Sequence, residues 1–418
     1  LMGLAGWILA ERIRVSSAAV QAGYGALTEA VQQNLKGIRT IQSHGQEDRE
    51  IRHFAGVSHG YAATSQQLAR WRALLGGTMA LVSGVMALVV VGVGGSRVQA
   101  GEMSIGALSA FILYLGMILG VIRSCSHPIY VLLNAATAAA RVFAILDERP
   151  EIDDSAAGAA PTIAGAIQVR GLSYAYPAPD GALGPPVLDD LSLDIAPGEF
   201  VAIIGGVGSG KTTLLNLLAR RLEPRAGSIA LDGRDLRTIP LGHLHHNLAF
   251  VTQDSFLFAT SIAENISFDD PDRPPEPIRA AARAARLEAT IDGFPEGLAT
   301  PVGERGVTLS GGQKQRTGLA RSLIRDTPVL LLDDSFSALD TETAAEILAT
   351  LHAMTPRPTT VLVSHRLATV RGADRIHVLE QGRIIESGTH HGLLAGDGHY
   401  ARLIRLQETQ STGAPERR

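Results

Sequence analysis

The chain has 418 residues, a net charge of −4 and 45% hydrophobic residues. This length exceeds one ordinary globular core and indicates two or three folded units. The balance of charge excludes a generally basic surface of the kind that binds nucleic acid. The single cysteine, Cys125, excludes an intramolecular disulfide.

The first ten residues form an apolar run that begins with Leu1 rather than Met. A signal peptide has a positively charged segment before its apolar region, and the sequence has none before this run, so we do not expect a signal peptide. We interpret it as the inner end of a membrane-spanning helix, in a chain truncated at its N-terminus. Residues 11–70 are polar, with apolar positions at helical spacing, and we expect them to project into the cytoplasm as helices. Gly37 and Gly45 are candidate turn positions there.

Two uncharged segments, 73–96 and 103–122, are each long enough to cross a bilayer core as a helix. Only six residues, 97–102, lie between them, which predicts a helical hairpin with a tight turn. Basic residues flank the other ends of the pair: Arg49, Arg52, Arg70 and Arg72 before it, Arg123 and Arg141 after it. The positive-inside bias therefore places those ends in the cytoplasm. The alternative is a pair of buried helices in a soluble core.

The second half of the chain has the pattern of an α/β domain. Residues 148–165 are rich in Pro, Gly, Ala and Asp and are expected to form a linker. After it, continuous apolar runs at 200–204, 329–332 and 360–363 suit strands of a parallel sheet that is covered on both faces. Residues 409–418 are expected to be a flexible tail.

A phosphate-binding loop follows the first of these strands. Residues 205–212 fit G-x-x-x-x-G-K-[ST] between a strand and a helix, the context that this motif requires. Glycines allow backbone N–H groups to converge on phosphates, at the positive end of the helix that begins near Lys211. Lys211 is expected to reach the β- and γ-phosphates, and the Thr212 hydroxyl to bind Mg²⁺. The alternative is a chance match in a glycine-rich protein.

Three polar residues follow other strands of the predicted sheet. Asp333 ends the run 329–332, where a carboxylate can hold Mg²⁺ on the phosphates; the alternative is a helix N-cap role. Gln253 and His365 each follow a strand. By themselves, a glutamine and a histidine at such positions are structural residues.

Taken in order, these segments and Leu309-Ser310-Gly311-Gly312-Gln313 resemble the nucleotide-binding domain of ABC exporters over residues 166–408. The resemblance implies that ATP binds to an adenine-stacking Tyr176, to the Walker A residues Gly205, Gly206, Val207, Gly208, Ser209, Gly210, Lys211, Thr212 and Thr213, and to the signature residues Ser310, Gly311, Gly312 and Gln313. It makes Thr212, Gln253 and Asp333 the Mg²⁺ ligands. It makes Asp334, His365 and Gln253 the catalytic residues. Residues 303–306 resemble a short exporter-specific segment, and 337–340 the family's D-loop.

Residues 1–147 similarly resemble part of an exporter transmembrane domain: the end of helix four, an intracellular loop, and helices five and six. Residues 29–42 are expected to contain the coupling helix that docks on the partner's cassette. The fold class is therefore a helical membrane region followed by a P-loop α/β domain with antiparallel β and α-helical subdomains. The resemblance implies a multi-pass protein of the plasma membrane, in contact with lipid, whose cassette is cytoplasmic.

One residue departs from the family's pattern. The family has Glu directly after the Walker B Asp, and here the residue is Asp334. Asp is one methylene, roughly 1.5 Å, shorter, and a misplacement of about 1 Å can slow a reaction about a hundredfold. A weak base beside an intact signature resembles the degenerate-site half of a heterodimeric exporter, which we favour. The alternative is a homodimer in which Asp334 works as the catalytic carboxylate.

Two other classes of function compete with an exporter half: a soluble ABC-type ATPase, and a non-catalytic regulatory subunit. The uncharged hairpin and the missing basic stripe argue against the soluble ATPase. The transported substrate, whether drug, lipid or peptide, is not readable from these residues.

Overall fold

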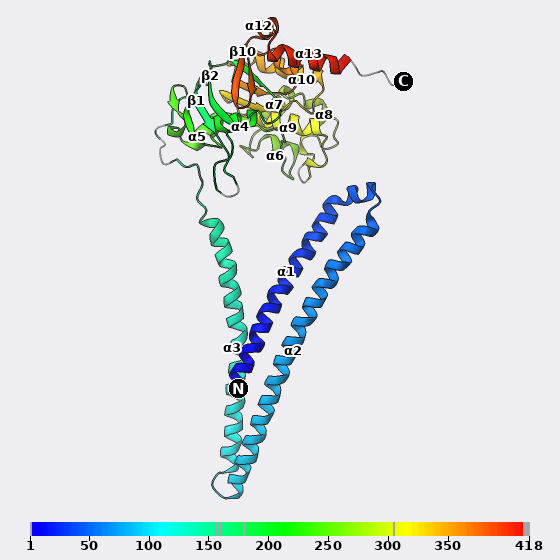
Figure 1. Ribbon diagram of the computed structural model, residues 1–418, viewed down its shortest axis with the longest axis vertical. Helices are drawn as coiled ribbons and strands as arrows, with labels where there is room; N and C mark the ends of the chain where they lie inside the picture. The colour runs from blue at the N-terminus through cyan, green and yellow to red at the C-terminus, as the bar shows by residue number, and fades with distance from the viewer. Residues whose placement is uncertain (1, 155–157, 159, 179–180, 304–305, 413–418) are drawn as a thin grey trace. The chain divides into compact units, whose positions relative to one another are not determined.

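The computed structural model describes residues 2–154, 158, 160–178, 181–303 and 306–412, and the chain divides into two compact units, 1–148 and 149–418 (Figure 1). The first unit consists of the helices α1 (Met2–Ser43), α2 (Glu47–Gln99) and α3 (Ile105–Leu146). Gly45 makes the turn between α1 and α2 with φ +58°, a conformation that glycine adopts at little cost. Gly37 lies inside α1 and makes no turn.

The predicted hairpin is confirmed as the end of α2 and the start of α3. The Ser104 hydroxyl caps α3 by accepting a hydrogen bond from the Ala107 backbone N–H over 3.1 Å. Close to the turn, a Cβ on Gly94 would lie 2.3 Å from Leu108 Cδ1. The glycine therefore allows the two helices to approach closely.

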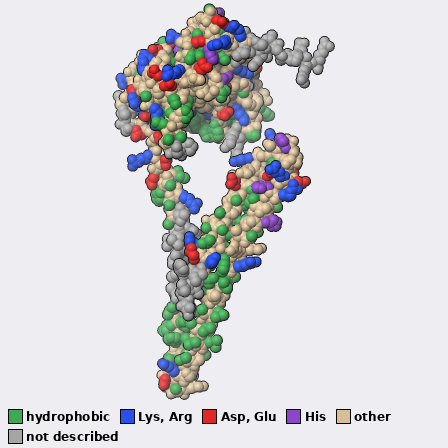
Figure 2. Space-filling view, viewed as in Figure 1, with side chains coloured by type: hydrophobic (Ala, Val, Ile, Leu, Met, Phe, Trp, Pro, Cys, Tyr) green, Lys and Arg blue, Asp and Glu red, His purple; other side chains and the backbone are tan. Residues whose placement is uncertain are grey.

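Large apolar side chains on this hairpin are exposed, among them Leu81, Leu88 and Leu113, and Figure 2 shows hydrophobic side chains covering it. Within the part of the chain that the structure describes, α2 has a stretch long and apolar enough to cross a membrane, whereas Ile105–Ile118 in α3 is shorter. Residues 29–42, expected to contain a coupling helix, are not a separate helix but the last turns of α1.

The second unit contains two sheets. The first is antiparallel, in the order β2-β1-β4-β5; the second has the order β10-β9-β3-β8-β7-β6 and is parallel except for β10. The strands are β1 (Ile167–Tyr174), β2 (Leu188–Ile195), β3 (Phe200–Ile204), β4 (Ala226–Leu231), β5 (Arg234–Asp235), β6 (Leu248–Val251), β7 (Val329–Asp333), β8 (Thr359–Val363), β9 (Arg375–Glu380) and β10 (Arg383–Gly388).

Helices cover both faces of the parallel sheet. The helices of the second unit are α4 (Lys211–Leu218), η1 (Leu236–Thr238), α5 (Leu241–Asn247), α6 (Ile262–Ile266), α7 (Pro275–Ala284), α8 (Glu288–Asp292), η2 (Gly297–Ala299), α9 (Gly311–Leu323), α10 (Thr341–Ala353), α11 (Leu367–Val370), α12 (His390–Ala395) and α13 (His399–Thr412). Every residue of β3, β7 and β8 is buried, which confirms the strands predicted from their continuous apolar runs.

Buried residues form one core on each face of this sheet. Phe200, Ala202 and Ile204 of β3 belong to the core shared with α6–α10, whereas Val201 and Ile203 belong to the core shared with α4 and the antiparallel sheet. This alternation follows from the two-residue period of a strand. It fixes β3, and the loop after it, between two packed layers.

The ends of the second unit differ from the expected linker and tail. The described residues among 149–165 belong to the compact cassette unit rather than standing apart from it. Helix α13 continues to Thr412, so the expected tail is helical over its first residues, and 413–418 lie outside the described part of the chain. The expected exporter-specific segment includes Glu304 and Arg305, which also lie outside it.

Candidate nucleotide site

The phosphate loop connects β3 to α4 and depends on glycine geometry. Gly208 and Gly210 have φ of +80° and +102°, which favours glycine. A Cβ on Gly205 would lie 2.1 Å from the Leu379 carbonyl oxygen of β9. These residues let the loop fold tightly over the edge of the sheet.

Lys211, the first residue of α4, turns back across this loop. Its ammonium donates to the carbonyls of Gly205 and Gly206 over 2.9 and 2.7 Å and lies 3.3 Å from the Ser209 hydroxyl. Burial lowers the pKa of Lys211, while the charges of Asp333 and Asp334 raise it. A partly desolvated ammonium held at the start of a helix is a strong donor for an anion.

The Walker B aspartate lies beside the phosphate loop. Asp333 ends β7, and its Oδ1 accepts a hydrogen bond from the Thr212 hydroxyl over 3.2 Å. Burial raises the pKa of Asp333, while the Thr212 hydrogen bond, Lys211 and His365 lower it. A hydroxyl and a buried carboxylate are oxygen donors that fit Mg²⁺. The N-cap alternative fails for Asp333, because the cap of α10 is Asp340.

Asp334 follows in a strained position. Its φ is +45°, unusual for a residue other than glycine, and its backbone N–H donates to the Val363 carbonyl over 2.9 Å. The side chain is buried, and its Oδ1 has no hydrogen-bond partner among the described residues. A buried, unpaired carboxylate oxygen is costly, so this atom is available to a group that binds beside it.

Three further predicted residues lie on exposed segments of the cassette. Gln253 and His365 follow β6 and β8 and are exposed. Since β6, β7 and β8 are parallel neighbours, both side chains begin at the edge of the sheet that carries Asp333. Tyr176 is 43% exposed and its hydroxyl lies 3.2 Å from the Thr213 hydroxyl. The structure thus connects Tyr176 with the phosphate loop.

The signature residues begin α9. Ser310 and Gln313 form a reciprocal capping box: the Gln313 N–H donates to the Ser310 hydroxyl, and the Ser310 N–H to the Gln313 side chain over 2.8 Å. A Cβ on Gly312 would lie 3.0 Å from the Ala338 carbonyl oxygen. The signature therefore packs directly against the loop 335–340.

Two residues that the sequence did not single out hold this loop. Gln315 of α9 donates to the Ser337 hydroxyl over 2.9 Å and accepts from the Ala338 N–H over 2.9 Å. Arg366, next to His365, donates to the carbonyls of Phe336 and Leu339. The sequence around Gln315 and Arg366 does not mark either residue as functional, because the tertiary fold sets their hydrogen-bond partners.

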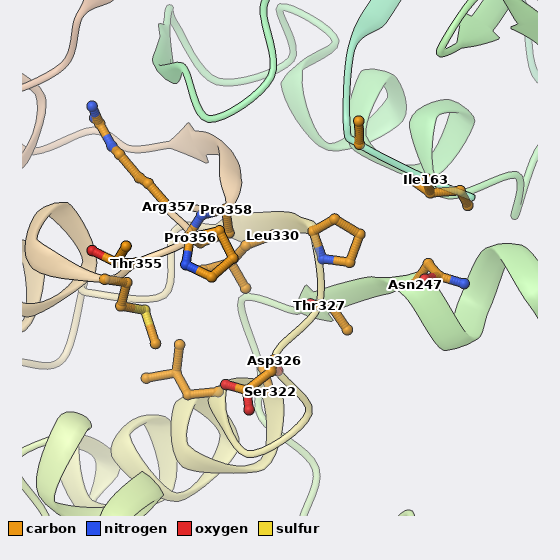
Figure 3. A pocket seen from close by; sticks show the side chains of 14 residues that line it. Ile163, Asn247, Ser322, Asp326, Thr327, Leu330, Thr355, Pro356, Arg357 and Pro358 are labelled. Carbon is orange, nitrogen blue, oxygen red and sulfur yellow. The ribbon is translucent and has the colours of Figure 1, made fainter.

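A cavity of about 620 Å³ lies elsewhere in the cassette (Figure 3). Pro328 and Pro358, which line it, precede β7 and β8. The cavity is therefore at the amino ends of these strands, whereas Asp333 and His365 are at the carboxyl ends. In open α/β sheets ligands bind at the carboxyl ends, so this cavity is not the nucleotide site.

The family models that match the chain are those of the ABC transporter, at residues 188–337, and the ABC transporter transmembrane region, at residues 1–122. Similar proteins include the ATP-dependent lipid A-core flippases of Aromatoleum aromaticum and Pseudomonas aeruginosa. Both are 37% identical over 97% of the chain, which spans 67% and 66% of their lengths. The chain belongs to the ABC exporters.

A solved structure of a bacterial Atm1-family ABC exporter with ATP bound supports this membership. It is 30% identical, with a TM-score of 0.86, over 96% of the chain and 70% of its own length. The predicted family and fold class, a helical membrane region fused to an ATP-binding cassette, are confirmed. ABC exporters are ATP hydrolases coupled to transmembrane transport, as the sequence predicted. The chain spans about two thirds of the length of these curated relatives.

Proposed function

We propose that this chain is one half of an ATP-driven exporter, in which paired cassettes bind and hydrolyse ATP to move a substrate across the plasma membrane. The observation that carries the proposal is the contact between Thr212 and Asp333 beside the buried ammonium of Lys211. This arrangement stands in a cassette that follows an exporter membrane region in the same chain.

Each residue of the site then has a role in ATP chemistry. When ATP binds, Lys211 donates to phosphate oxygens in place of the loop carbonyls. Its positive charge stabilises the negative charge on the phosphates. Thr212 and Asp333, with Gln253, would hold Mg²⁺, which neutralises charge on the phosphates. Tyr176 offers its exposed ring to adenine.

In this proposal, Asp334 and His365 act on the attacking water. The unpaired Oδ1 of Asp334 accepts a hydrogen bond from that water and orients it. His365 supplies a second polar group at the same edge of the sheet. Because Asp334 is roughly 1.5 Å shorter than Glu, hydrolysis at this chain's own Walker A site is expected to be slow.

The partner is a second exporter half. We favour a different chain, whose site would be completed by Ser310, Gly311, Gly312 and Gln313 of this one. The alternative is a homodimer in which Asp334 reaches the water after a small shift of its turn. The intact signature is compatible with both, and the short carboxylate favours the first.

The relatives' names point to a lipid substrate. They are flippases of lipid A-core, and the exposed apolar side chains on α2 and α3 suit contact with lipid. We therefore propose an amphipathic lipid with a bulky polar headgroup as the substrate class. The arginines at 49, 52, 70 and 72 favour a cytoplasmic cassette under the positive-inside rule.

The test uses the full-length protein in phospholipid vesicles that contain a fluorescent lipid A-core probe, alone and with a candidate partner half. ATP-dependent movement of the probe between leaflets is expected, and Lys211→Ala is expected to abolish it. ATP hydrolysis without movement of the probe would overturn the lipid substrate. Recovery of the chain in the soluble fraction of the cell would instead favour a non-transport ABC ATPase.

A further inference from the structure

Arg220 is a buried arginine directly after the phosphate-loop helix. Helix α4 ends at Leu218, and Arg220 has φ +48° with its side chain 4% exposed. A left-handed conformation is costly for a residue other than glycine, and a buried guanidinium requires partners. Arg220 therefore keeps this position because of what its side chain binds.

The guanidinium joins the linker to the cassette. Its Nη2 donates to the Asp153 carbonyl over 2.8 Å, and its Nη1 lies 3.7 Å from Oδ1 of Asp154. From the cassette side it also donates to the Ile239 carbonyl over 3.1 Å. The desolvated side chain thus holds two consecutive linker residues against the segment after η1.

Other contacts fix the same linker. Asp154 Oδ1 accepts from the Leu241 N–H over 2.7 Å at the start of α5, and the Gly158 N–H donates to the Thr238 carbonyl over 2.8 Å. The N–H groups of 164–166 donate to the carboxylate of Asp232. The described linker residues are therefore held at both ends.

Helix α4 has a nucleotide end and a linker end. Lys211 and Thr212 stand at its first turn, and Arg220 stands just past its last. Eight residues of helix form a rigid rod about 12 Å long. Toward the membrane, only six residues, 147–152, separate α3 from Asp153. A displacement of α4 on binding phosphate would thus be passed through Arg220 to the linker.

We infer that Arg220 and Asp154 are positioning residues that couple nucleotide binding at α4 to the linker of the same chain. This route lies within one chain, apart from any contact with a partner. The inference rests on the proposed function, since it requires ATP to bind at Lys211. A purely structural role for the pair would stabilise the cassette without responding to nucleotide.

The test measures amide hydrogen exchange at 158–166 in the full chain in nanodiscs, with and without a non-hydrolysable ATP analogue and Mg²⁺. We expect the analogue to change exchange of these amides about fivefold, within the usual range of coupling between sites. Asp154→Ala is expected to remove that response. Asp154→Asn keeps the acceptor for the Leu241 N–H and is expected to retain most of it. Asp194→Ala, an exposed carboxylate on β2, is the control.

The outcomes separate the two proposals. Failure of the unsubstituted chain to bind the analogue would overturn the proposed function and this inference with it. Binding without a response of the linker, or an equal response in Asp154→Ala, would overturn the inference alone. If Asp154→Ala both loses the response and has a lower melting temperature, the pair has a structural role and the inference is overturned. Because coupling between two sites is reciprocal, Asp154→Ala is expected to change the affinity of the chain for the analogue by no more than about fivefold. Arg220→Lys, which retains the charge but not the fork, provides a second variant.

Discussion

The Thr212 hydroxyl donates to Asp333 Oδ1 over 3.2 Å, joining the first turn of α4 to the carboxyl end of β7. This contact places two candidate Mg²⁺ ligands from distant parts of the sequence within reach of one ion. Lys211, beside them, is the cation on which phosphate binding is expected to depend most.

Lys211→Ala is expected to weaken binding of an ATP analogue on the order of tenfold to a hundredfold, because a charge-assisted hydrogen bond contributes about 1.5–3 kcal/mol. Isothermal titration of the full chain measures the change. Lys36→Ala, an exposed lysine in α1, is the control and is expected to bind normally. Equal affinity in the two variants would refute the role of Lys211.

Gly205→Ala and Gly206→Ala place the same methyl group at neighbouring positions of the loop. A Cβ at Gly205 meets the Leu379 carbonyl, whereas one at Gly206 meets nothing within 4 Å. Overpacking of this kind costs roughly 1–3 kcal/mol, so the melting temperature is expected to fall in Gly205→Ala and to change little in Gly206→Ala. Similar melting temperatures for both variants would contradict the packing described for this loop.

If the chain is a degenerate-site half, substitutions at Asp334 and Ser310 are expected to reduce ATPase activity by different amounts. Ser310→Arg is expected to abolish the partner site's hydrolysis, whereas Asp334→Ala reduces total activity much less. Asp334→Glu adds the missing methylene and is expected to raise activity. Steady-state ATPase of the full-length pair measures all three, and equal losses in Asp334→Ala and Ser310→Arg would favour the homodimer.

His377 of β9 is expected to make the cassette sensitive to acid. Its Nδ1 lies 2.9 Å from the Ser387 hydroxyl, and its buried Nε2 has no hydrogen-bond partner among the described residues. Burial, with a smaller effect of Arg375, lowers the pKa of His377 from 6.5 to about 4. As the pH falls, His377 is therefore protonated near pH 6.5 in the unfolded chain but only near pH 4 in the folded chain. The contribution of His377 to the free energy of unfolding is fully present above pH 6.5. It is lost as the pH falls from 6.5 to about 4, by at most about 3 kcal/mol.

Thermal melts of the full chain at pH 7 and pH 5 test this window. The fall in melting temperature is expected to be smaller in His377→Gln than in the unsubstituted chain, whatever the stability of the variant at pH 7. His391→Gln, at an exposed histidine, is expected to retain the full fall. The same pH dependence in both variants would exclude His377 as its source.

The sequence by itself determined the strands of the parallel sheet and predicted the phosphate-binding residues. Continuous apolar runs placed β3, β7 and β8, since a strand buried on both faces requires apolar residues throughout. The glycine spacing of 205–210 and Lys211 identified the phosphate loop, since few loops bring backbone N–H groups onto phosphate. These properties depend on neighbouring residues, and a sequence records them directly.

Only the tertiary structure decided which residues support the site. The pairing of Thr212 with Asp333, the unpaired Oδ1 of Asp334 and the docking of Asp153 on Arg220 all depend on strand order and helix packing. The residues 148–165 have the composition of a free linker, yet described residues among them are bound to the cassette. Such contacts join residues far apart in the chain, and their free energy depends on burial that no local pattern of residues reveals.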